Sequence, residues 1–238
     1  MTIKGAALAR KAAAILTALL LIPIAAACDD SDWNWPQDID PAAIAADIGD
    51  ADLHGYTIAT EPTDTFAVVM APSSVLPEGG AFVIEMYSDY APRTVKHIST
   101  LVGAGFYNGL KFHRVSHGFV IQAGSPFGDG TGGSGKTIKG EFADNGVKNE
   151  LKHKTYVVSM GRLTGSDAAA YDSADSQFFI CLADNAAKLD GMYAAFGKVI
   201  AGTEVVDALG RAETAGTANR PIEDLVMTRV FFVEKPAG

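Results

Sequence analysis

Phe112–Gly124 reads FHRVSHGFVIQAG and carries the most informative pattern in the chain. Its aromatic and β-branched residues are typical of two adjacent β-strands. We predict strands over residues 111–115 and 119–123, with Arg114 and Gln122 on neighbouring strands, each among apolar residues. An arginine in this setting is usually a surface cation that covers a hydrophobic edge, so the stretch alone does not assign it a role.

Further strand-like runs occur on both sides of this stretch. Phe66–Ala71 and Ala81–Tyr87 are apolar and are separated by a loop that contains Pro and Gly. Long loops rich in Gly, Asp and Ala occupy 124–140 and 161–175. The later strands are predicted at Tyr156–Met160, Gln177–Leu182, Ala194–Ile200 and Leu225–Val233.

Two helices are predicted among these strands. Pro92 suits a first helical turn, and the apolar residues after it recur at three- and four-residue steps. A second short helix is predicted over Glu204–Leu209. Many short strands with two helices indicate one mainly β domain over residues 65–236. We expect a closed barrel with helical plugs, because closure removes unpaired edge strands.

Residues 1–27 have the pattern of an export signal. Cations at positions 4, 10 and 11 precede an apolar stretch over 12–27, which ends in three alanines. This stretch is shorter than the roughly 20 residues that a membrane-spanning helix needs. We therefore predict that residues 1–27 are a signal peptide.

Cys28 follows Ile24–Ala27, and together they resemble the lipobox of bacterial lipoproteins. In that motif the cysteine receives a diacylglyceryl group and becomes the new N-terminus, so Cys28 is the predicted lipidation site. Ordinary signal cleavage is the alternative. Residues 28–64 are rich in Asp, Ala and Pro and are predicted to be a tether, with one short helix around Pro41–Ile48. The expected location is the membrane, where the anchored protein would face the periplasm or the cell exterior.

The charge of the chain argues against several classes of partner. The formal net charge is −9, and it becomes −12 when residues 1–27 are removed, because they carry three cations and no acid. A protein this acidic has no general electrostatic attraction for nucleic acid or for an anionic membrane surface. No basic run is present in the sequence, so we expect no nucleic-acid partner.

Neither a metal site nor a nucleotide site is expected. His113 and His117 are four residues apart, but on strands this spacing does not make two side chains converge, and no third ligand is evident. Cys181 lies in an apolar run and is expected to be a small buried hydrophobic residue. Gly130–Thr137 satisfies the phosphate-loop formula G-x-x-x-x-G-K-[ST]. Strand-like residues rather than a helix follow it, so we reject nucleotide binding.

Five motifs in the chain resemble those of the cyclophilins, in the same order. The motifs are APRTV at 91–95, FHRVSHGFVIQAG at 112–124, GTGG at 130–133 with GEF at 140–142, SQFFI at 176–180, and LDGMYAAFG at 189–197. The resemblance covers residues 80–233. It implies an eight-stranded antiparallel barrel capped by two helices, with peptidyl-prolyl cis/trans isomerase activity and no cofactor.

The resemblance also implies roles for individual residues. Arg114 looks like the catalytic arginine, and Gln122 looks like the side chain that hydrogen-bonds the substrate backbone. The residues implied as the floor and walls of a proline pocket are Phe119, Val120, Phe179 and Leu189. The residues implied to line the same groove are Gly161, Gln177 and Tyr193.

These residue types suit the chemistry of prolyl isomerisation. Rotation of an X–Pro bond crosses a barrier of about 18–20 kcal/mol that amide resonance sets, and without catalysis it takes ~10–100 s. An apolar pocket can hold the proline ring and remove water from the amide. A guanidinium can then hydrogen-bond the prolyl nitrogen as it becomes pyramidal, which stabilises the twisted amide more than either planar form.

Several positions differ from the usual pattern of the family. Lys188 stands where cyclosporin-sensitive members carry Trp before Leu-Asp-Gly, so we expect weak cyclosporin binding. Tyr193 replaces a common His, and Val120 replaces the commoner Met. Gly161 and Arg162 stand where Ala-Asn is frequent. These changes bear on inhibitor and substrate preference and leave the catalytic arginine intact.

Two functions are consistent with the sequence. The first is an isomerase, expected to be a monomer, that accelerates proline-limited folding of exported proteins and takes Pro-containing polypeptides as its partners. The alternative is a membrane-tethered module that binds proline-containing segments as a chaperone with little turnover, which the changes in the groove would suit. Arg114, Gln122 and Phe179 favour the enzyme, because Arg114 serves the twisted amide more than ground-state binding.

Overall fold

The computed structural model describes residues 39–235. The predicted signal peptide, Cys28 and the first part of the predicted tether lie outside these residues. The fold described below belongs to the second of the two units into which the chain divides, Asp32–Gly238. In the part of the chain that the structure describes, no helix combines the length and the apolar character needed to cross a membrane.

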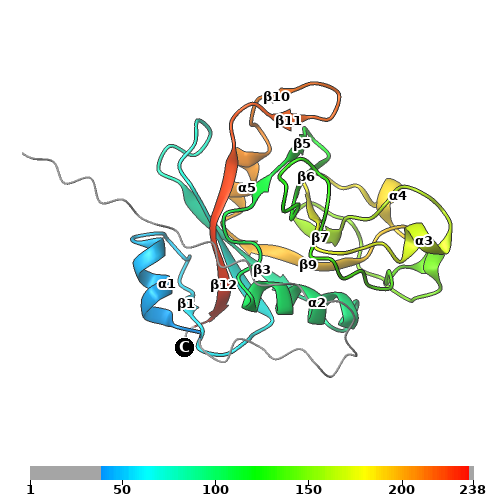
Figure 1. Ribbon diagram of the computed structural model, residues 1–238, viewed down its shortest axis with the longest axis horizontal. Coiled ribbons are helices and arrows are strands. Elements are labelled where there is room, and N and C mark those ends of the chain that lie inside the picture. The colour runs from blue at the N-terminus through cyan, green and yellow to red at the C-terminus, as the bar shows by residue number, and fades with distance from the viewer. Residues whose placement is uncertain (1–38, 236–238) are drawn as a thin grey trace, which may run out of the picture. The chain divides into compact units, whose positions relative to one another are not determined.

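The second unit is built mainly from antiparallel β-strands (Figure 1). Its strands are β1 (Thr57–Ile58), β2 (Thr65–Met70), β3 (Gly80–Met86), β4 (Lys111–Phe112), β5 (Arg114–Ser116), β6 (Val120–Ala123), β7 (Val157–Met160), β8 (Phe178–Cys181), β9 (Ala195–Ala201), β10 (Thr214–Ala215), β11 (Arg220–Pro221) and β12 (Leu225–Glu234). Within residues 39–235, ten of them form one sheet in the order β1-β12-β2-β3-β9-β7-β8-β6-β5, with β4 attached to β12. β10 and β11 form a separate pair.

One interrupted strand closes this sheet into a barrel. β4 and β5 are separated only by His113, and they pair with different strands. β4 places Phe112 beside Leu225 of β12, and β5 places Arg114 beside Gln122 of β6. Counted as one strand, β4 and β5 complete a circuit of eight antiparallel strands within the described residues. The predicted antiparallel barrel is therefore present. Its closure pairs the two ends of the eight-strand circuit, and β1 lies outside the circuit beside β12.

Two helices plug the barrel, as predicted. α2 (Pro92–Gly103) and α5 (Thr203–Leu209) lie at different edges of the strands in Figure 1, and both bury apolar residues in the main core. The buried carboxylate of Glu141 accepts hydrogen bonds from the Arg93 and Thr94 amides, which satisfies the first turn of α2. Three shorter helical turns were not predicted: α3 (Ala168–Tyr171), α4 (Ala186–Leu189) and the 3-10 turn Ala143–Asn145.

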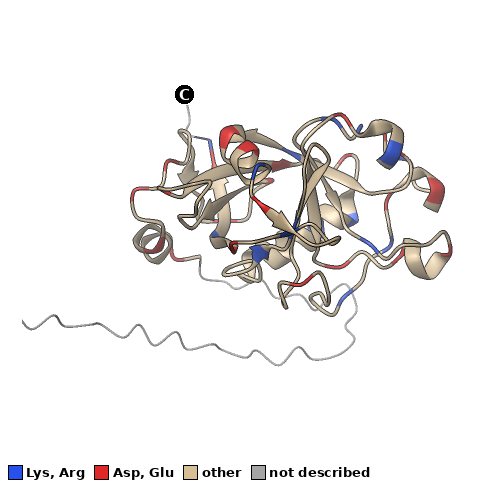
Figure 2. Cartoon of the chain, turned by 90° about the horizontal axis from the view of Figure 1, so that it is seen from above, with Lys and Arg blue, Asp and Glu red and all other residues tan. Residues whose placement is uncertain are grey.

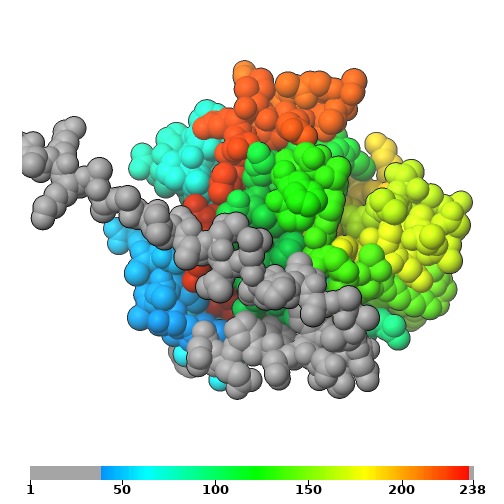
Figure 3. Space-filling view, viewed as in Figure 1, coloured from blue at the N-terminus to red at the C-terminus, as the bar shows by residue number. Residues whose placement is uncertain are grey.

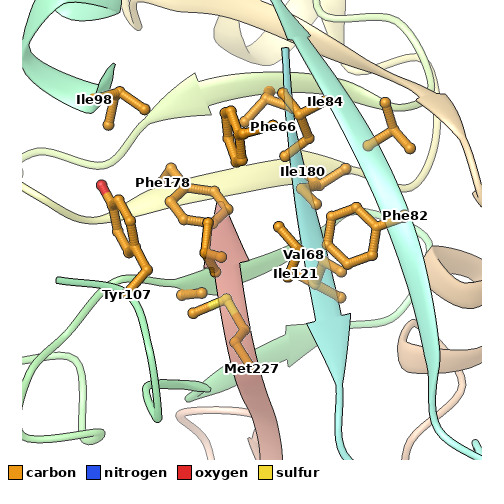
Figure 4. Close-up of a cluster of buried hydrophobic side chains, with 14 of the residues drawn as sticks. Phe66, Val68, Phe82, Ile84, Ile98, Tyr107, Ile121, Phe178, Ile180 and Met227 are labelled. Carbon is orange, nitrogen blue, oxygen red and sulfur yellow. The ribbon is translucent and has the colours of Figure 1, made fainter. Parts of the chain in front are cut away.

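Apolar side chains from alternating strand positions fill the barrel interior (Figure 4). In β2, Phe66 and Val68 belong to this main core, whereas Ala67 and Val69 belong to a second apolar cluster on the other face of the strand. All six residues of β2 are therefore buried, which explains why its sequence lacks the alternation of a half-exposed strand. Other core residues labelled in Figure 4 are Phe82, Ile84, Ile98, Tyr107, Ile121, Phe178, Ile180 and Met227.

The second cluster is covered by a segment that the sequence analysis assigned to the tether. α1 (Pro41–Ile48), which was predicted as a short helix, begins after Asp40, whose carboxylate accepts hydrogen bonds from two first-turn amides at 3.0 and 3.2 Å. Ile44 packs into the cluster formed by β2, β3 and β12, and β1 pairs with β12. Residues 39–64 therefore pack as part of the folded unit. α1, in blue, lies away from the yellow segments that carry α3 and α4 (Figures 1 and 3).

Candidate active site

Three of the predicted site residues lie in one row across strands β5, β6 and β8. The strand register places Arg114 beside Gln122, and Gln122 beside Phe179. Side chains alternate along a strand, so residues in register project from the same face of a sheet. The fold thus brings a cation, an amide and an aromatic ring from two distant sequence segments onto one surface.

A chain of hydrogen bonds orients the polar members of this surface. Arg114 Nη1 donates to Gln122 Oε1 at 3.4 Å, and Gln122 Nε2 donates to Gln177 Oε1 at 3.0 Å. Gln177 Nε2 in turn donates to the carbonyl oxygens of Gly130 and Gly132 at 2.9 and 3.0 Å. The chain fixes the orientation of both amides. Its first bond, at 3.4 Å, is long and therefore weak.

A small apolar cluster, separate from the main core, includes the aromatic end of the row. Val120, Phe179 and Leu189 are buried in it, with exposed fractions of 2, 5 and 6 %. Phe119 and Tyr193 are partly buried and pack against it, and the Phe179 and Tyr193 rings meet edge to face with their centroids 5.6 Å apart. These side chains form an apolar floor with an aromatic rim, which suits a proline ring.

Phe179 rests on a histidine that the sequence analysis missed. The His153 ring stacks on it with a centroid distance of 6.1 Å and an interplanar angle of 20°. His153 Nδ1 lies 2.9 Å from Asp190 Oδ1, and its Nε2 lies 3.0 Å from Ser159 Oγ. Burial lowers the pKa of His153 below its ordinary value, although the adjacent Asp190 opposes the shift. No sequence spacing signals this support, because the contact depends on how separate strands and loops pack.

Gly161 lies against the two glutamines of the hydrogen-bonded chain. Its amide donates to the Gln177 carbonyl oxygen at 2.8 Å. A Cβ at position 161 would lie 3.3 Å from Gln177 Cβ and 3.4 Å from Gln122 Nε2, so a side chain here would press on both amides. The structure therefore brings the seven predicted pocket and groove residues, together with Arg114 and Gln122, into one connected surface of nine residues. Cys28 lies outside the described residues.

His113 and His117, the pair considered as metal ligands, have different surroundings. His117 Nε2 lies 2.9 Å from the carbonyl oxygen of Ala212. His113 is buried, and its Nδ1 has no hydrogen-bond partner within the described residues. Burial, followed by the positive charge of Arg114, lowers the pKa of His113 to about 4, so its ring is neutral at pH 7. Within residues 39–235, no group of three or more His, Cys, Asp or Glu side chains is placed to hold a metal ion.

Backbone amides of the glycine-rich segment Gly130–Thr137 already donate hydrogen bonds to a carboxylate. Asp175 accepts hydrogen bonds from the Ser134 amide at 2.7 Å and from the Gly135 amide at 3.0 Å. The next residue, Ile138, pairs in an extended bridge with Ala174. The segment therefore lacks the free amides at a helix N-terminus that a phosphate loop needs.

Cys181 lies in the apolar cluster beside Phe179 and is fully buried. Burial raises the pKa of its thiol to about 12. The side chain is therefore an uncharged thiol at pH 7 rather than a nucleophilic thiolate. This is the small buried hydrophobic residue that the sequence predicted.

A further pocket of about 470 Å³ adjoins the apolar cluster and shares Phe119, Leu189 and Tyr193 with it. Two cations, Arg162 and Lys188, also line this pocket. Both positions differ from the usual pattern of the family that the sequence resembles, and no spacing in the sequence places them in a common pocket.

Comparisons with known proteins give a consistent result. The family model for cyclophilin-type peptidyl-prolyl cis-trans isomerases (Cyclophilin type peptidyl-prolyl cis-trans isomerase/CLD) matches residues 73–231, a range that contains all nine residues of the connected surface. A peptidyl-prolyl cis-trans isomerase of Helicobacter pylori is 41% identical over 136 residues, which are 56% of this chain and 77% of that protein. The peptidyl-prolyl cis-trans isomerase-like 1 of Aspergillus oryzae is 35% identical over 156 residues, which are 66% of this chain and 91% of that protein.

Solved structures support the same fold. A cyclophilin-type peptidyl-prolyl cis-trans isomerase of Cryptosporidium parvum aligns with a TM-score of 0.61 at 24% identity and covers 73% of this chain and 99% of its own. A second structure of that isomerase, obtained in the presence of the dipeptide Ala-Pro, aligns with a TM-score of 0.59 at 25% identity. It covers 70% of this chain and 97% of its own.

Proposed function

The chain belongs to the cyclophilin-type peptidyl-prolyl cis-trans isomerase family and is such an isomerase, and we propose that Arg114 is its catalytic residue. The observation that carries this proposal is the row formed by Arg114, Gln122 and Phe179. In this row a guanidinium lies two strands away from an aromatic floor. A proline ring on that floor would bring its own nitrogen toward the guanidinium.

Arg114 would act on the amide as it twists. Twisting breaks the resonance that sets a barrier of about 18–20 kcal/mol, and the prolyl nitrogen then gains a lone pair that can accept a hydrogen bond. The guanidinium donates to this nitrogen in the twisted state and has no equivalent acceptor in either planar state. No bond is made or broken, and each 1.36 kcal/mol of such preference gives about tenfold in rate.

The other site residues would position the substrate. Phe119, Val120, Phe179 and Leu189 are proposed to enclose the proline ring, which displaces water from the amide and strengthens the bond from Arg114. Gln122 is proposed to hydrogen-bond the substrate backbone. The remaining residues proposed to line the groove are Gly161, Gln177 and Tyr193.

The N-terminal sequence supports a role outside the cytoplasm. Residues 1–27 have the order of an export signal, and the segment before Cys28 is lipobox-like. The proposed protein is a lipid-anchored monomer that faces the periplasm or the cell exterior and assists the folding of exported proteins. Intact-mass analysis of protein purified from membranes tests the anchor, because an unmodified Cys28 would contradict it.

Lys188 supports the proposal of weak cyclosporin binding. Its ammonium lies 5.3 Å from the centroid of the Phe119 ring, at the edge of the proposed proline pocket. A flexible cation there offers less apolar contact to an inhibitor than an indole ring. A titration with cyclosporin tests this expectation.

Turnover of a proline-containing test peptide by the full chain tests the catalytic role. Arg114→Ala should lower kcat/KM by about 100-fold or more, the typical cost of losing one preorganised transition-state donor, while peptide binding is largely kept. Arg114→Lys is the matched control, because it keeps the charge but loses the planar fork. Full activity of a folded Arg114→Ala variant would exclude the proposed role. Peptide binding by the wild-type chain without turnover would favour the alternative binding module.

A further inference from the structure

Arg162 holds a rigid position at the side of the pocket that adjoins the proline site. Its Cζ lies 4.8 Å from the centroid of the Tyr193 ring, 5.0 Å from that of Tyr171 and 5.3 Å from that of Phe142. Three aromatic rings therefore surround the guanidinium, an arrangement that stabilises the cation and limits its movement.

The hydrogen bonds of Arg162 leave one of its nitrogen atoms available. Nε donates to the Met192 carbonyl oxygen at 2.9 Å, and Nη1 donates to those of Leu163 and Gly165 at 2.8 and 3.0 Å. Within residues 39–235, Nη2 has no acceptor, although a guanidinium carries two N–H groups there. Arg162 is thus preorganised to receive a further acceptor, and a carboxylate matches its geometry best.

Lys188 brings a second positive charge to the same pocket from α4. Its ammonium lies over the Phe119 ring, and the residue is exposed. Neither Lys188 nor Arg162 forms an ion pair with a carboxylate in the described part of the chain. Two cations without a carboxylate partner therefore line one pocket.

The acids nearest in sequence to these cations are engaged elsewhere. Asp184 pairs with Lys154 at 2.9 Å, and Asp190 pairs with Lys152 at 3.2 Å and also contacts His153. Asp167 accepts a hydrogen bond from the amide of Ala170 and caps α3. Acidic and basic positions are interspersed along the chain in Figure 2. The residues that line this pocket include Arg162 and Lys188 and no acid.

Resting on the proposed isomerase function, we infer that this pocket selects proline-containing segments with an acidic side chain close to the proline. The pocket shares Phe119, Leu189 and Tyr193 with the proposed proline site, so a bound segment enters both at once. Its volume of about 470 Å³ lies within the ordinary range of ligand pockets, about 300–1,000 Å³. The Glu or Asp carboxylate binds between Arg162 Nη2 and the Lys188 ammonium.

The two cations in the pocket, rather than the net charge of the whole molecule, should determine this preference. The chain has a formal net charge of −9, which gives a weak general repulsion for acidic peptides. Ionic strength screens that repulsion over a Debye length of about 8 Å at physiological salt. A carboxylate in contact with two cations is much less screened. The preference should therefore persist at 0.15 M salt and weaken near 1 M.

A peptide series with one proline and a single Glu, Gln or Lys at each neighbouring position tests the inference on the full chain. At one position or more, kcat/KM should rank Glu above Gln and Gln above Lys. Exposed ion pairs contribute up to about 1 kcal/mol each, so the ratio between Glu and Lys peptides should be roughly three- to tenfold. The Gln peptides serve as the uncharged reference.

Variants locate the preference in the pocket. Lys188→Glu should bring the Glu-to-Lys ratio to one or below, and Arg162→Lys should reduce it by losing the planar fork. Arg162→Lys also guards against a loop disturbed by charge removal, since it keeps the cation over the three rings. Lys198→Glu is the matched control for net charge: it lies on an exposed position of β9 and should leave the ratio unchanged.

The outcomes separate this inference from the proposed function. Equal kcat/KM for Glu, Gln and Lys peptides at every position would overturn the acidic preference and leave the isomerase intact. An equal change from Lys198→Glu and Lys188→Glu would also overturn it. Absence of turnover for every peptide would overturn the proposed function instead. Calorimetric binding of the same peptides would then test the pocket, with tighter Glu binding as support and equal binding as refutation.

Discussion

Two outer faces of the barrel differ in what covers them. Over β2, β3 and β12, outward apolar side chains form a cluster that α1 covers with Ile44. Over β6 and β8, a smaller outward cluster around Phe179 keeps the rings of Phe119 and Tyr193 partly exposed. An apolar outer face needs a partner. The chain supplies that partner on the first face, and we propose that the proline of a client supplies it on the second.

Because side chains alternate along a strand, neighbouring residues of one strand can serve either stability or the proposed site. In β6, Ile121 and Ala123 belong to the main core, whereas Val120 belongs to the site cluster and Gln122 to the hydrogen-bonded row. The same strand therefore contributes to stability with one face and to the site with the other. Substitutions on the α1 face should change stability alone. Two such substitutions and one pH effect on the site side test the comparison.

The largest stability effect is expected for Ile44→Ala. This change leaves a cavity under α1 and should lower the free energy of unfolding by about 2–4 kcal/mol. Because α1 is far from the site, kcat/KM should stay within about twofold of the wild-type value. Denaturant unfolding and peptide turnover measure both quantities. Ile200→Ala, at a 37 % exposed position of β9, is the matched control and should have little effect. A folded Ile44→Ala variant with strongly reduced turnover would show that the two faces are coupled.

A loss of stability of intermediate size is expected when the pH falls. It arises from His113, next to Arg114 of the proposed site. Burial, then the charge of Arg114, lowers the pKa of His113 to about 4, against roughly 6.5 in the unfolded chain. The unfolded state then binds more protons between these values, so this contribution is complete above pH 6.5 and is lost as the pH falls toward 4. We expect a loss of about 1–2 kcal/mol after allowing for partial solvent screening.

Urea unfolding at pH 7 and pH 4.5 measures this loss. The difference between the two values should shrink in His113→Gln and should be unchanged in Ile44→Ala. An unaltered difference in His113→Gln would assign the acid sensitivity to other buried groups. His97 and His153 have pKa values lowered by burial as well.

The smallest effect is expected for Asp40→Ala. It removes the carboxylate that accepts two amide hydrogen bonds at the start of α1, and such caps contribute typically ~1 kcal/mol. Asp40→Asn should cost much less, because its amide oxygen can still cap the helix. Thermal unfolding distinguishes the two variants. An equal loss in both would mean that the charge rather than the hydrogen bonds stabilises α1.

Much of the barrel follows from local patterns in the sequence. The strands at β2, β3, β6, β7, β8 and β9 and the helices α2 and α5 fall within a residue or two of their predicted ranges. Short apolar runs and the Pro92 signal suffice for these elements. The two-residue strands β1, β10 and β11 were not predicted, because pairing rather than residue pattern defines them.

Only part of the site could be predicted from local patterns in the sequence. Arg114 and Gln122 were placed on neighbouring strands from their alternation, and the structure pairs them. The register of Phe179 beside Gln122 depends on how distant segments meet, as does the stacking of His153. Arg162 was noted only as a departure from a pattern. Its three surrounding rings come from separate segments of the chain, one of them helix α3, so no local spacing could reveal them.

The interrupted strand formed by β4 and β5, which closes the barrel, should also determine when the enzyme first becomes active. Every proposed groove residue lies between positions 114 and 193, yet the strand that carries Arg114 continues from β4, whose partner is the far later β12. Contacts of such long sequence separation form slowly. A chain that emerges from its N-terminus therefore contains all the proposed site residues well before β12 can pair with β4 and complete the strand that carries Arg114. Recovery of turnover during refolding should accordingly lag behind secondary structure and mark the moment at which β12 pairs with β4.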